Sequence, residues 1–172
     1  MHVRRLARTF GAAVAVTLMA GVGTAPSALA STPAVAPASQ IQYELVNQGG
    51  GFLCMDDVGG GVGLKGAKCI GAANETWFIA TVNSFGEIRF QNLQTMGCLV
   101  VVSNTPSLTG CNPRAANQTW VATFVDGADD AQFANVDSTT CLGMNLTTLR
   151  IEMEPCNTGT KRQIWQVSGA TD

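Results

Sequence analysis

Asn117-Gln118-Thr119-Trp120 is the stretch that decides the fold, because closely related residues recur at two other places in the chain. Asn74-Glu75-Thr76-Trp77 precedes it, and Gln163-Ile164-Trp165 follows it. The three tryptophans, which are the only ones in the chain, are 43 and 45 residues apart, so a unit of about 44 residues occurs three times. Self-similarity at a fixed period of this size predicts an architecture of repeated structural units.

Each unit also contains an apolar-x-Asn step and two cysteines, and the cysteines account for all six in the chain. The first cysteine follows the step by six or seven residues, the second comes 13 to 15 residues later, and the tryptophan stands eight or nine residues beyond it. The three steps are Leu45 to Asn47, Phe90 to Asn92 and Phe133 to Asn135. One structural unit therefore has to explain the whole repeat.

The N-terminal thirty residues are typical of a secretory signal peptide. Three arginines stand among the first eight residues, an uncharged apolar stretch covers residues 10–22, and Ala28-Leu29-Ala30 provides a small-x-small cleavage site. Residues 31–40 are rich in Ala, Pro and Ser and are predicted to form a disordered leader. The folded domain is predicted at residues 41–172, in a secreted, extracellular protein.

Removal of the signal peptide makes the protein acidic. Three of the ten Lys and Arg residues and the only histidine, His2, lie in the signal peptide, which leaves seven basic against twelve acidic residues and a net charge of −5. An acidic domain has no electrostatic basis for binding nucleic acid. After the signal peptide nothing approaches 18 uninterrupted apolar residues, so no membrane span is expected.

Export makes disulfides the expected state of the six cysteines. Six thiols allow 15 pairings, but copies of one ancestral unit should each carry their own bridge. The expected bridges are Cys54–Cys69, Cys98–Cys111 and Cys141–Cys156. A zinc site is not expected, because the chain has no Cys-x-x-Cys pair and the mature protein has no histidine. The sequence thus predicts no metal or other cofactor.

Short runs rich in aromatic and β-branched residues predict strands, at residues 77–82, 88–90, 98–102 and 120–125. Segments with the composition of tight turns lie between such runs, at residues 49–51, 59–61, 83–86 and 126–127. No stretch shows a sustained helical period with caps at both ends. The sequence predicts an all-β protein whose three lobes pack around a shared axis, because one lobe alone cannot bury its apolar face.

The three tryptophan motifs, each behind a cysteine pair, resemble the Gln-x-Trp repeats of the ricin B-chain type β-trefoil lectins. The resemblance covers residues 41–169. It implies a twelve-stranded β-trefoil with pseudo-threefold symmetry, in which Trp77, Trp120 and Trp165 pack in the core and hold the lobes together. Large aromatic side chains are mostly core residues, which agrees with a structural role for these three.

The resemblance also implies a sugar site elsewhere in the lobe. In that family an Asp two residues after the first cysteine accepts hydrogen bonds from sugar hydroxyls, an aromatic before the second cysteine stacks on the ring, and an Asn three before the tryptophan completes the set. Lobe one matches with Asp56 and Asn74, and its Glu75 replaces the Gln of Gln-x-Trp but still accepts hydrogen bonds. We expect these three residues to bind carbohydrate. Asp56 and Asp57 are equally typical of a turn ahead of the glycines at 59–61.

The other lobes depart from the family pattern. At the two polar positions lobe two has Val100 with Asn117, and lobe three has Gly143 with Arg162. The stacking aromatic is missing from all three lobes, where Ala67, Thr109 and Glu154 stand instead. Phe52 or Phe85 would have to supply stacking from a loop. The sequence therefore predicts a weakened or altered sugar site in lobe one.

Two functions follow from these features. The first is a secreted carbohydrate-binding module with weak or altered binding of galactose-type sugars or other glycans through lobe one, whose partners are glycans or glycoproteins. The alternative is a trefoil scaffold that has lost sugar binding and binds or inhibits a protein partner that the sequence does not identify. An enzyme is not expected, because the mature chain lacks histidine, all cysteines are expected to be paired, and the carboxylates are scattered.

Overall fold

The computed structural model describes residues 41–59, 63–125 and 129–169. The predicted signal peptide, the predicted leader, most of the turn predicted at 59–61 and the whole turn predicted at 126–127 lie outside them. Lobe one contains β1 (Gln42–Asn47), β2 (Leu53–Asp57), β3 (Leu64–Lys68) and β4 (Thr76–Thr81). Lobe two contains β5 (Ile88–Asn92), β6 (Cys98–Val102), β7 (Thr105–Thr109), the 3-10 helix η1 (Ala116–Gln118) and β8 (Trp120–Phe124). Lobe three contains β9 (Asp130–Asn135), β10 (Cys141–Met144), β11 (Ile151–Glu154), η2 (Lys161–Gln163) and β12 (Trp165–Gly169).

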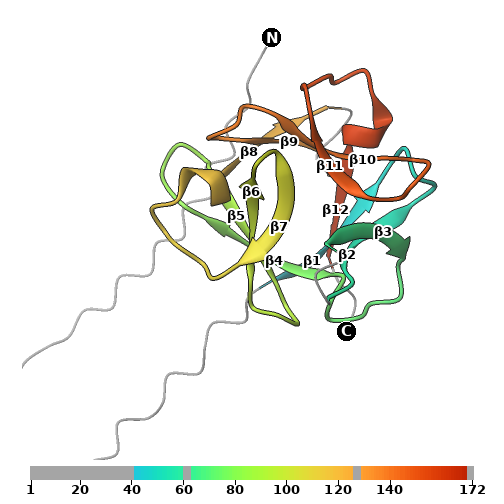
Figure 1. Cartoon of the computed structure of the whole chain (residues 1–172), viewed down its shortest axis with the longest axis horizontal. Coiled ribbons are helices and arrows are strands. Elements are labelled where there is room, and N and C mark those ends of the chain that lie inside the picture. Colours follow the sequence, from blue (N-terminus) through green and yellow to red (C-terminus); the bar gives the residue numbers. More distant parts are fainter. Residues whose placement is uncertain (1–40, 60–62, 126–128, 170–172) are drawn as a thin grey trace, which may run out of the picture. The chain divides into compact units, whose positions relative to one another are not determined.

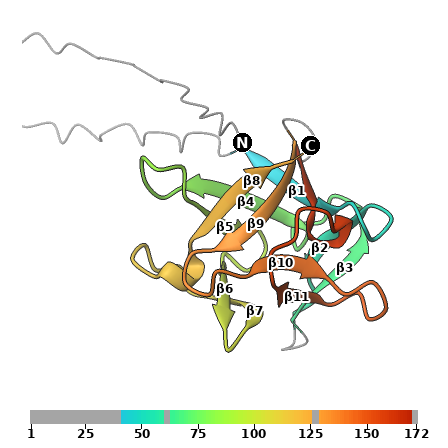
Figure 2. The same cartoon turned by 90° about the horizontal axis from the view of Figure 1, so that it is seen from above.

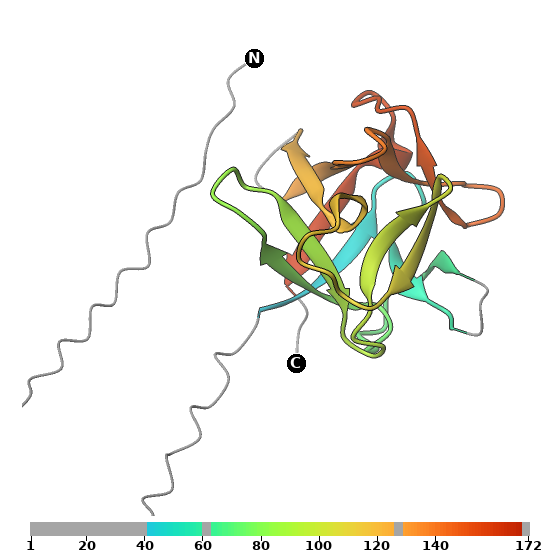
Figure 3. The ribbon, with the colours of Figure 1, turned by 60° about the vertical axis from the view of Figure 1, so that its left-hand side comes forward.

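Six strands close into an antiparallel barrel in the order β12, β1, β4, β5, β8, β9 and back to β12 (Figure 1). Figure 3 shows β1 running between β12 and β4. The other six strands form one hairpin per lobe, β2–β3, β6–β7 and β10–β11. The hairpins lie together on one side of the barrel (Figure 2). This arrangement is the β-trefoil, so the predicted fold class is confirmed, and closure leaves the barrel without a free edge.

The predicted strands match the observed ones to within about two residues at each end. The 3-10 helices η1 and η2, which immediately precede β8 and β12, are not predicted from the sequence. A single 3-10 turn is too short to produce a hydrophobic period, which explains why the pattern gave no signal. Among the described residues, no helix has the length and apolar character needed to cross a membrane.

The tryptophans form equivalent parts of the core. Trp77, Trp120 and Trp165 are fully buried, and each lies at or beside the start of the last strand of its lobe. Each indole N–H donates a hydrogen bond to a hairpin carbonyl of its own lobe, at 3.0 Å to Met55, 3.3 Å to Leu99 and 2.9 Å to Leu142. The tryptophan therefore joins the barrel to the hairpin within each lobe, and its polar atom is satisfied in the core.

The buried asparagines of the apolar-x-Asn steps bind adjacent lobes to one another. Asn92 in lobe two donates from Nδ2 to the carbonyl of Asn74 in lobe one at 2.9 Å, and its Oδ1 accepts from the backbone N–H groups of Gln94 and Thr95. The equivalent Nδ2 bonds run from Asn135 to the Asn117 carbonyl at 3.0 Å and from Asn47 to the Arg162 carbonyl at 2.8 Å. Each asparagine thus clamps the segment before the tryptophan of the preceding lobe, and the three clamps form a closed circuit.

The structure confirms one disulfide within each lobe. The bonds are Cys54–Cys69, Cys98–Cys111 and Cys141–Cys156, and no free cysteine occurs among the described residues. Each bond joins the first strand of a hairpin to the residues that follow its second strand. In the chain-entropy model a loop of about 15 residues closed in this way stabilises the fold by roughly 3 kcal/mol.

The residue two positions before each first cysteine has a left-handed backbone, although none of the three is glycine. The φ angles are 64° at Phe52, 54° at Met96 and 58° at Thr139. In lobes two and three the N–H of this residue donates to the carbonyl of the asparagine clamp, at 2.9 Å to Asn92 and 3.0 Å to Asn135. The sequence gives no signal for this conformation, because glycine and asparagine are the usual residues with positive φ.

Candidate functional site in lobe one

Asp56 and Asn74 lie together, as the motif positions predict. Asp56 is in β2, opposite Lys65 of β3, and only 7% of its surface is exposed. Asn74 lies in the turn before β4, and its Nδ2 donates a hydrogen bond to Oδ1 of Asp56. The N–H of Asp57 also donates to the Asn74 carbonyl at 3.1 Å, which holds the turn against β2. These two hydrogen bonds therefore hold Asp56 and the turn that carries Asn74 in a fixed arrangement.

Glu75 has a different environment from this pair. Its side chain is 2% exposed, and its Oε2 accepts a hydrogen bond from the backbone N–H of Ile70 at 2.8 Å. Gln118 and Gln163, the equivalent residues of the other lobes, accept from backbone N–H groups in the same way, at 2.8 Å each. Glu75 thus holds the loop after the second cysteine. Its Oε2 atom therefore has a hydrogen-bond partner within the protein. A contact between Glu75 and sugar stays a prediction.

Asp57 explains why the sequence also favoured a turn here. Its Oδ1 accepts from the N–H of Gly59 at 3.1 Å, and Gly59 has a φ of 65°. This short-range bond is the one that an aspartate makes at the start of a turn. The two adjacent aspartates therefore divide the roles, since Asp57 forms the turn and Asp56 bonds to Asn74 instead.

Burial raises the pKa of Asp56 above the ordinary value of 3.8. Loss of hydration is the largest cause, and the charges of Glu75 and Asp57 act in the same direction. The hydrogen bond from Asn74 and the charge of Lys65 oppose the shift without cancelling it. Burial of the ionised Asp56 carboxylate therefore lowers the stability of the fold. Groups with such shifted pKa values cluster at functional sites.

The raised pKa predicts that Asp56→Asn stabilises the protein at neutral pH. A carboxyl whose pKa is higher in the folded chain binds its proton more tightly there, so stability falls as pH rises from the unfolded to the folded pKa. The amide keeps an acceptor for Asn74 and has no charge to bury. We expect a higher melting temperature for Asp56→Asn at pH 7 and no gain at pH 3, where Asp56 itself is protonated. A gain of equal size at both pH values would contradict the burial argument.

The other two lobes lack this pair. In lobe two Val100 is buried in β6, and Asn117 donates its Nδ2 hydrogen bond to the Val101 carbonyl at 3.2 Å. In lobe three the equivalent space is filled. Glu154 forms an ion pair with Arg162 at 2.9 Å, and a Cβ atom on Gly143 would lie 3.3 Å from the Glu154 side chain.

Among the described residues, the two phenylalanines predicted to replace the missing stacking residue lie away from the Asp56–Asn74 pair along the chain. Ala67, which stands at that position in lobe one, is half-buried in β3. Phe52 is 64% exposed, but it precedes Asp56 by four residues of extended chain, roughly 13 Å. Phe85 is 88% exposed in the turn at the far end of β4, roughly 17 Å of strand away from Asn74. Neither phenylalanine is placed to cover a sugar ring bound at Asp56.

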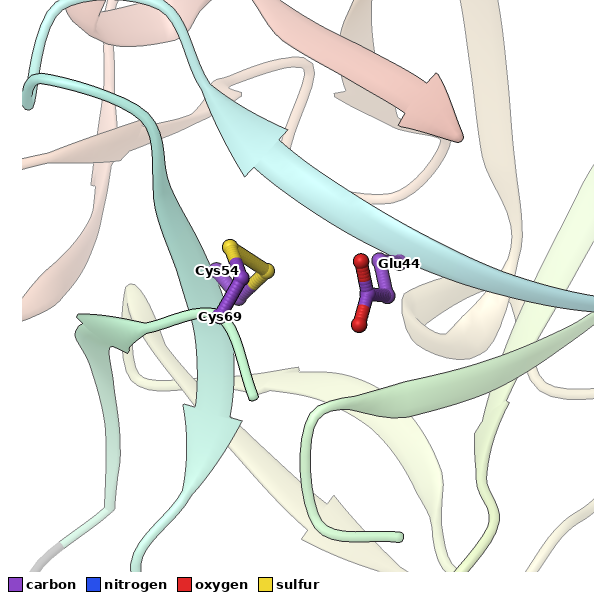
Figure 4. Close-up of side chains that lie close together, drawn as sticks. All are labelled: Glu44, Cys54 and Cys69. Carbon is purple, nitrogen blue, oxygen red and sulfur yellow. A yellow bond between two sulfur atoms is a disulfide. The ribbon is translucent and has the colours of Figure 1, made fainter. Parts of the chain in front are cut away.

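A group of possible metal ligands lies nearby, at Glu44, Cys54 and Cys69 (Figure 4). The carboxylate and the two sulfurs lie within 4.8 Å of one another. The sulfurs are bonded to each other as the lobe-one disulfide, so neither is the thiolate that binds metals. This group therefore does not fit a metal ion.

Comparison with known proteins identifies the fold. A sequence model described as the ricin-type beta-trefoil lectin domain matches residues 42–165. No curated protein sequence matches the chain. Among solved structures, the designed threefold-symmetric protein ThreeFoil has a TM-score of 0.64 at 16% identity, over 74% of this chain and 97% of that chain.

Natural proteins share the same architecture. The cytolethal distending toxin of Haemophilus ducreyi has a TM-score of 0.67 at 16% identity, over 82% of this chain and 91% of that chain. The exo-beta-1,3-galactanase 1,3Gal43A of Clostridium thermocellum has a TM-score of 0.64 at 16% identity, over 77% of this chain and 31% of that chain. This chain thus spans about a third of the galactanase, and at such identities the similarity shows the fold alone.

Proposed function

Because the chain belongs to the family of ricin-type β-trefoil lectin domains, we propose that it is a non-catalytic carbohydrate-binding module that acts through lobe one. The Asp56–Asn74 pair carries this proposal, because among the described residues lobe one alone has both polar groups of the family pattern. A charged acceptor makes the stronger, directional hydrogen bonds that adjacent sugar hydroxyls require. Asn74 fixes the orientation of that acceptor.

The ligand that fits best is a neutral, galactose-type sugar on a glycan or glycoprotein. Ala67 offers no ring for stacking, so binding depends on hydrogen bonds that compete with water. We expect a dissociation constant for galactose of about 1 mM or weaker, near −4 kcal/mol. Useful affinity then requires a longer glycan or several modules that bind together.

Secretion forms part of the proposal. The signal peptide predicted at residues 1–30 and the three disulfides both agree with an oxidising, extracellular location. Outside the cell, glycans and glycoproteins are also available as partners. Analysis of the N-terminus of exported protein tests this part, since cleavage after Ala30 is the expected result.

Asp56→Ala is expected to abolish sugar binding, because the ligand hydroxyls lose their charged acceptor. Asp137→Ala is the matched control, since it removes the same charge from an exposed turn of lobe three. Titration of both variants with galactose and lactose, followed by NMR, measures the effect. The control should bind as the wild type does. Undiminished binding by Asp56→Ala would move the site out of lobe one.

The alternative function is a scaffold that has lost sugar binding. Two observations favour it, namely the absence of an aromatic at the stacking positions of all three lobes and the Glu154–Arg162 ion pair that fills lobe three. A glycan array screened with the full chain separates the two functions. Binding that Asp56→Ala removes supports the lectin, and a wild-type protein that binds no glycan supports the scaffold.

A further inference from the structure

The residue before each apolar-x-Asn step has a different identity in each lobe, at Glu44, Arg89 and Gln132. In lobe three Gln132 is buried, and its Nε2 donates to the side-chain oxygen of Gln163 at 2.8 Å. In lobe one Glu44 lies beside the disulfide (Figure 4). In lobe two the same position holds a cation. The three lobes therefore differ in charge at this one equivalent position, which is acidic in lobe one, basic in lobe two and neutral in lobe three.

Arg89 is the one of these residues that has buried, unpaired polar atoms. Its Nε and Nη2 atoms are shielded from solvent and have no hydrogen-bond partner among the described residues. The ion pair found in this part of the chain joins Arg162 to Glu154 and does not involve Arg89. Buried guanidinium donors without an acceptor destabilise a fold, so Arg89 favours any anion that reaches it.

A cavity of about 430 Å³ lies against Arg89 on the outer face of β4 and β5. Its walls include the aromatic rings of Tyr43 and Phe78, the amide side chain of Gln91 and the Cys98–Cys111 disulfide. None of the lining residues is acidic. The volume lies within the range of roughly 300–1,000 Å³ that is typical of small-ligand sites. The cavity therefore combines one cation, apolar walls and room for one ring.

We propose that this cavity binds a carboxylate carried on a sugar ring, that is, a hexuronic acid residue. The planar guanidinium of Arg89 matches the two oxygens of a carboxylate. Tyr43 and Phe78 provide apolar surface for the C–H groups of the ring. The assignment of the ligand as a sugar rests on the proposed lectin function, whereas the preference for an acid rests on Arg89 alone.

Binding requires a movement of the Arg89 side chain, because its Nε and Nη2 atoms are covered by protein atoms. The guanidinium turns toward the cavity and meets the carboxylate there. The Nε and Nη2 atoms of Arg89 have no hydrogen-bond partner among the described residues, and the ion pair found there joins two other residues, so the movement breaks no bond of these two atoms. This cavity and the lobe-one site have opposite charge preferences, since the Asp56 carboxylate repels an acidic ligand that Arg89 attracts.

The test is a titration of the full chain with sodium D-glucuronate and with D-glucose, its neutral counterpart, at low ionic strength. We expect glucuronate to bind at least about tenfold more tightly than glucose, because only the acid pairs with Arg89. Raising the salt concentration should weaken glucuronate binding and leave glucose unaffected. Equal binding of the two sugars, or no binding of glucuronate, would overturn the proposal.

Arg89→Met should weaken glucuronate binding at least about tenfold, because it keeps an apolar stem and removes the charge. Arg114→Gln is the control, since it removes the same charge from an exposed loop, and it should bind glucuronate as the wild type does. The melting temperature of Arg89→Met should equal or exceed that of the wild type, because no buried donor is left unpaired. If that variant does not fold, Arg89→Lys, which keeps the charge but lacks the planar fork, should weaken binding several-fold. Unchanged affinity in the variant that folds would overturn the role of Arg89.

Two further ligands test the proposal more closely. Benzoate shows whether the cavity prefers a sugar acid to another acid, and galactose shows whether the lobe-one site binds sugar. Benzoate carries a carboxylate on a ring that is not a sugar, and benzoate binding as tight as glucuronate binding would overturn the sugar assignment. Galactose tests lobe one in the same protein sample. Glucuronate binding without galactose binding would support this cavity and reject the lobe-one site, and the reverse would reject this cavity alone.

Discussion

Trp120→Ala is expected to lower the free energy of unfolding by about 3–5 kcal/mol. The side chain is fully buried, and its ring contacts Phe90 edge-on at a centroid distance of 6.1 Å. Truncation leaves a cavity in the shared core and removes the hydrogen bond to the Leu99 carbonyl. Since a domain of this size is stable by only about 5–15 kcal/mol, one such change removes a large share of the total.

Urea unfolding of the wild type and the variant measures this loss. Phe124→Ala is the matched control, because it truncates an aromatic residue of the same strand that is 50% exposed. We expect the control to lose less than about 1 kcal/mol, as is usual for surface positions. Losses of similar size in the two variants would show that Trp120 is not part of the core.

Asn92→Ala is expected to cost about 2–4 kcal/mol, because it leaves several backbone groups without partners. The Oδ1 atom accepts from the N–H groups of Gln94 and Thr95, and Nδ2 donates across the lobe boundary to Asn74. Asn92 itself is fully buried. Water cannot easily replace these bonds, so the variant pays the desolvation cost of the groups left unpaired.

Asn112→Ala is the control for the asparagine clamp. The Oδ1 atom of Asn112 also accepts a hydrogen bond from a backbone N–H group two residues later, that of Arg114 at 3.0 Å, but this bond is exposed. Its loss should cost less than about 1 kcal/mol, because water takes the place of the side chain. If Asn92→Ala were no more destabilising than Asn112→Ala in the same urea experiment, the clamp would not hold the lobes together.

The fold was predictable because its determinants recur in the sequence. Cysteines and tryptophans at matched spacings mark each lobe, and the pairing of Cys98 with Cys111 follows once the lobe is defined as a copy. In the sequence the asparagines of the apolar-x-Asn steps only marked the start of each repeat, and their role in binding adjacent lobes was not predicted. That Asn92 holds the neighbouring lobe depends on how two lobes meet, and no local pattern encodes this contact.

The candidate site was predictable to the extent that it depends on position within the repeat. The motif located Asp56 and Asn74, but the burial that raises the pKa of Asp56 comes from strands folded over it. Glu75 was predicted to bind sugar as an acceptor within the motif, whereas the hydrogen bond that it accepts from the N–H of Ile70 depends on the folded loop and has no signal in the sequence. Arg89 had one available signal, which was its difference from Glu44 and Gln132 at equivalent positions.

The closed circuit of asparagine clamps means that the architecture has no first lobe. At the seam between lobes three and one, Tyr43 pairs with Gly169, and Asn47 bonds to Arg162 as the other clamps bond to their neighbours. A circularly permuted domain that begins at Glu87, ends at Val82 and joins Gly169 to Ile41 by a short linker keeps every strand pair of the barrel. The order in which a gene encodes the lobes is therefore interchangeable, whereas their cyclic succession is fixed.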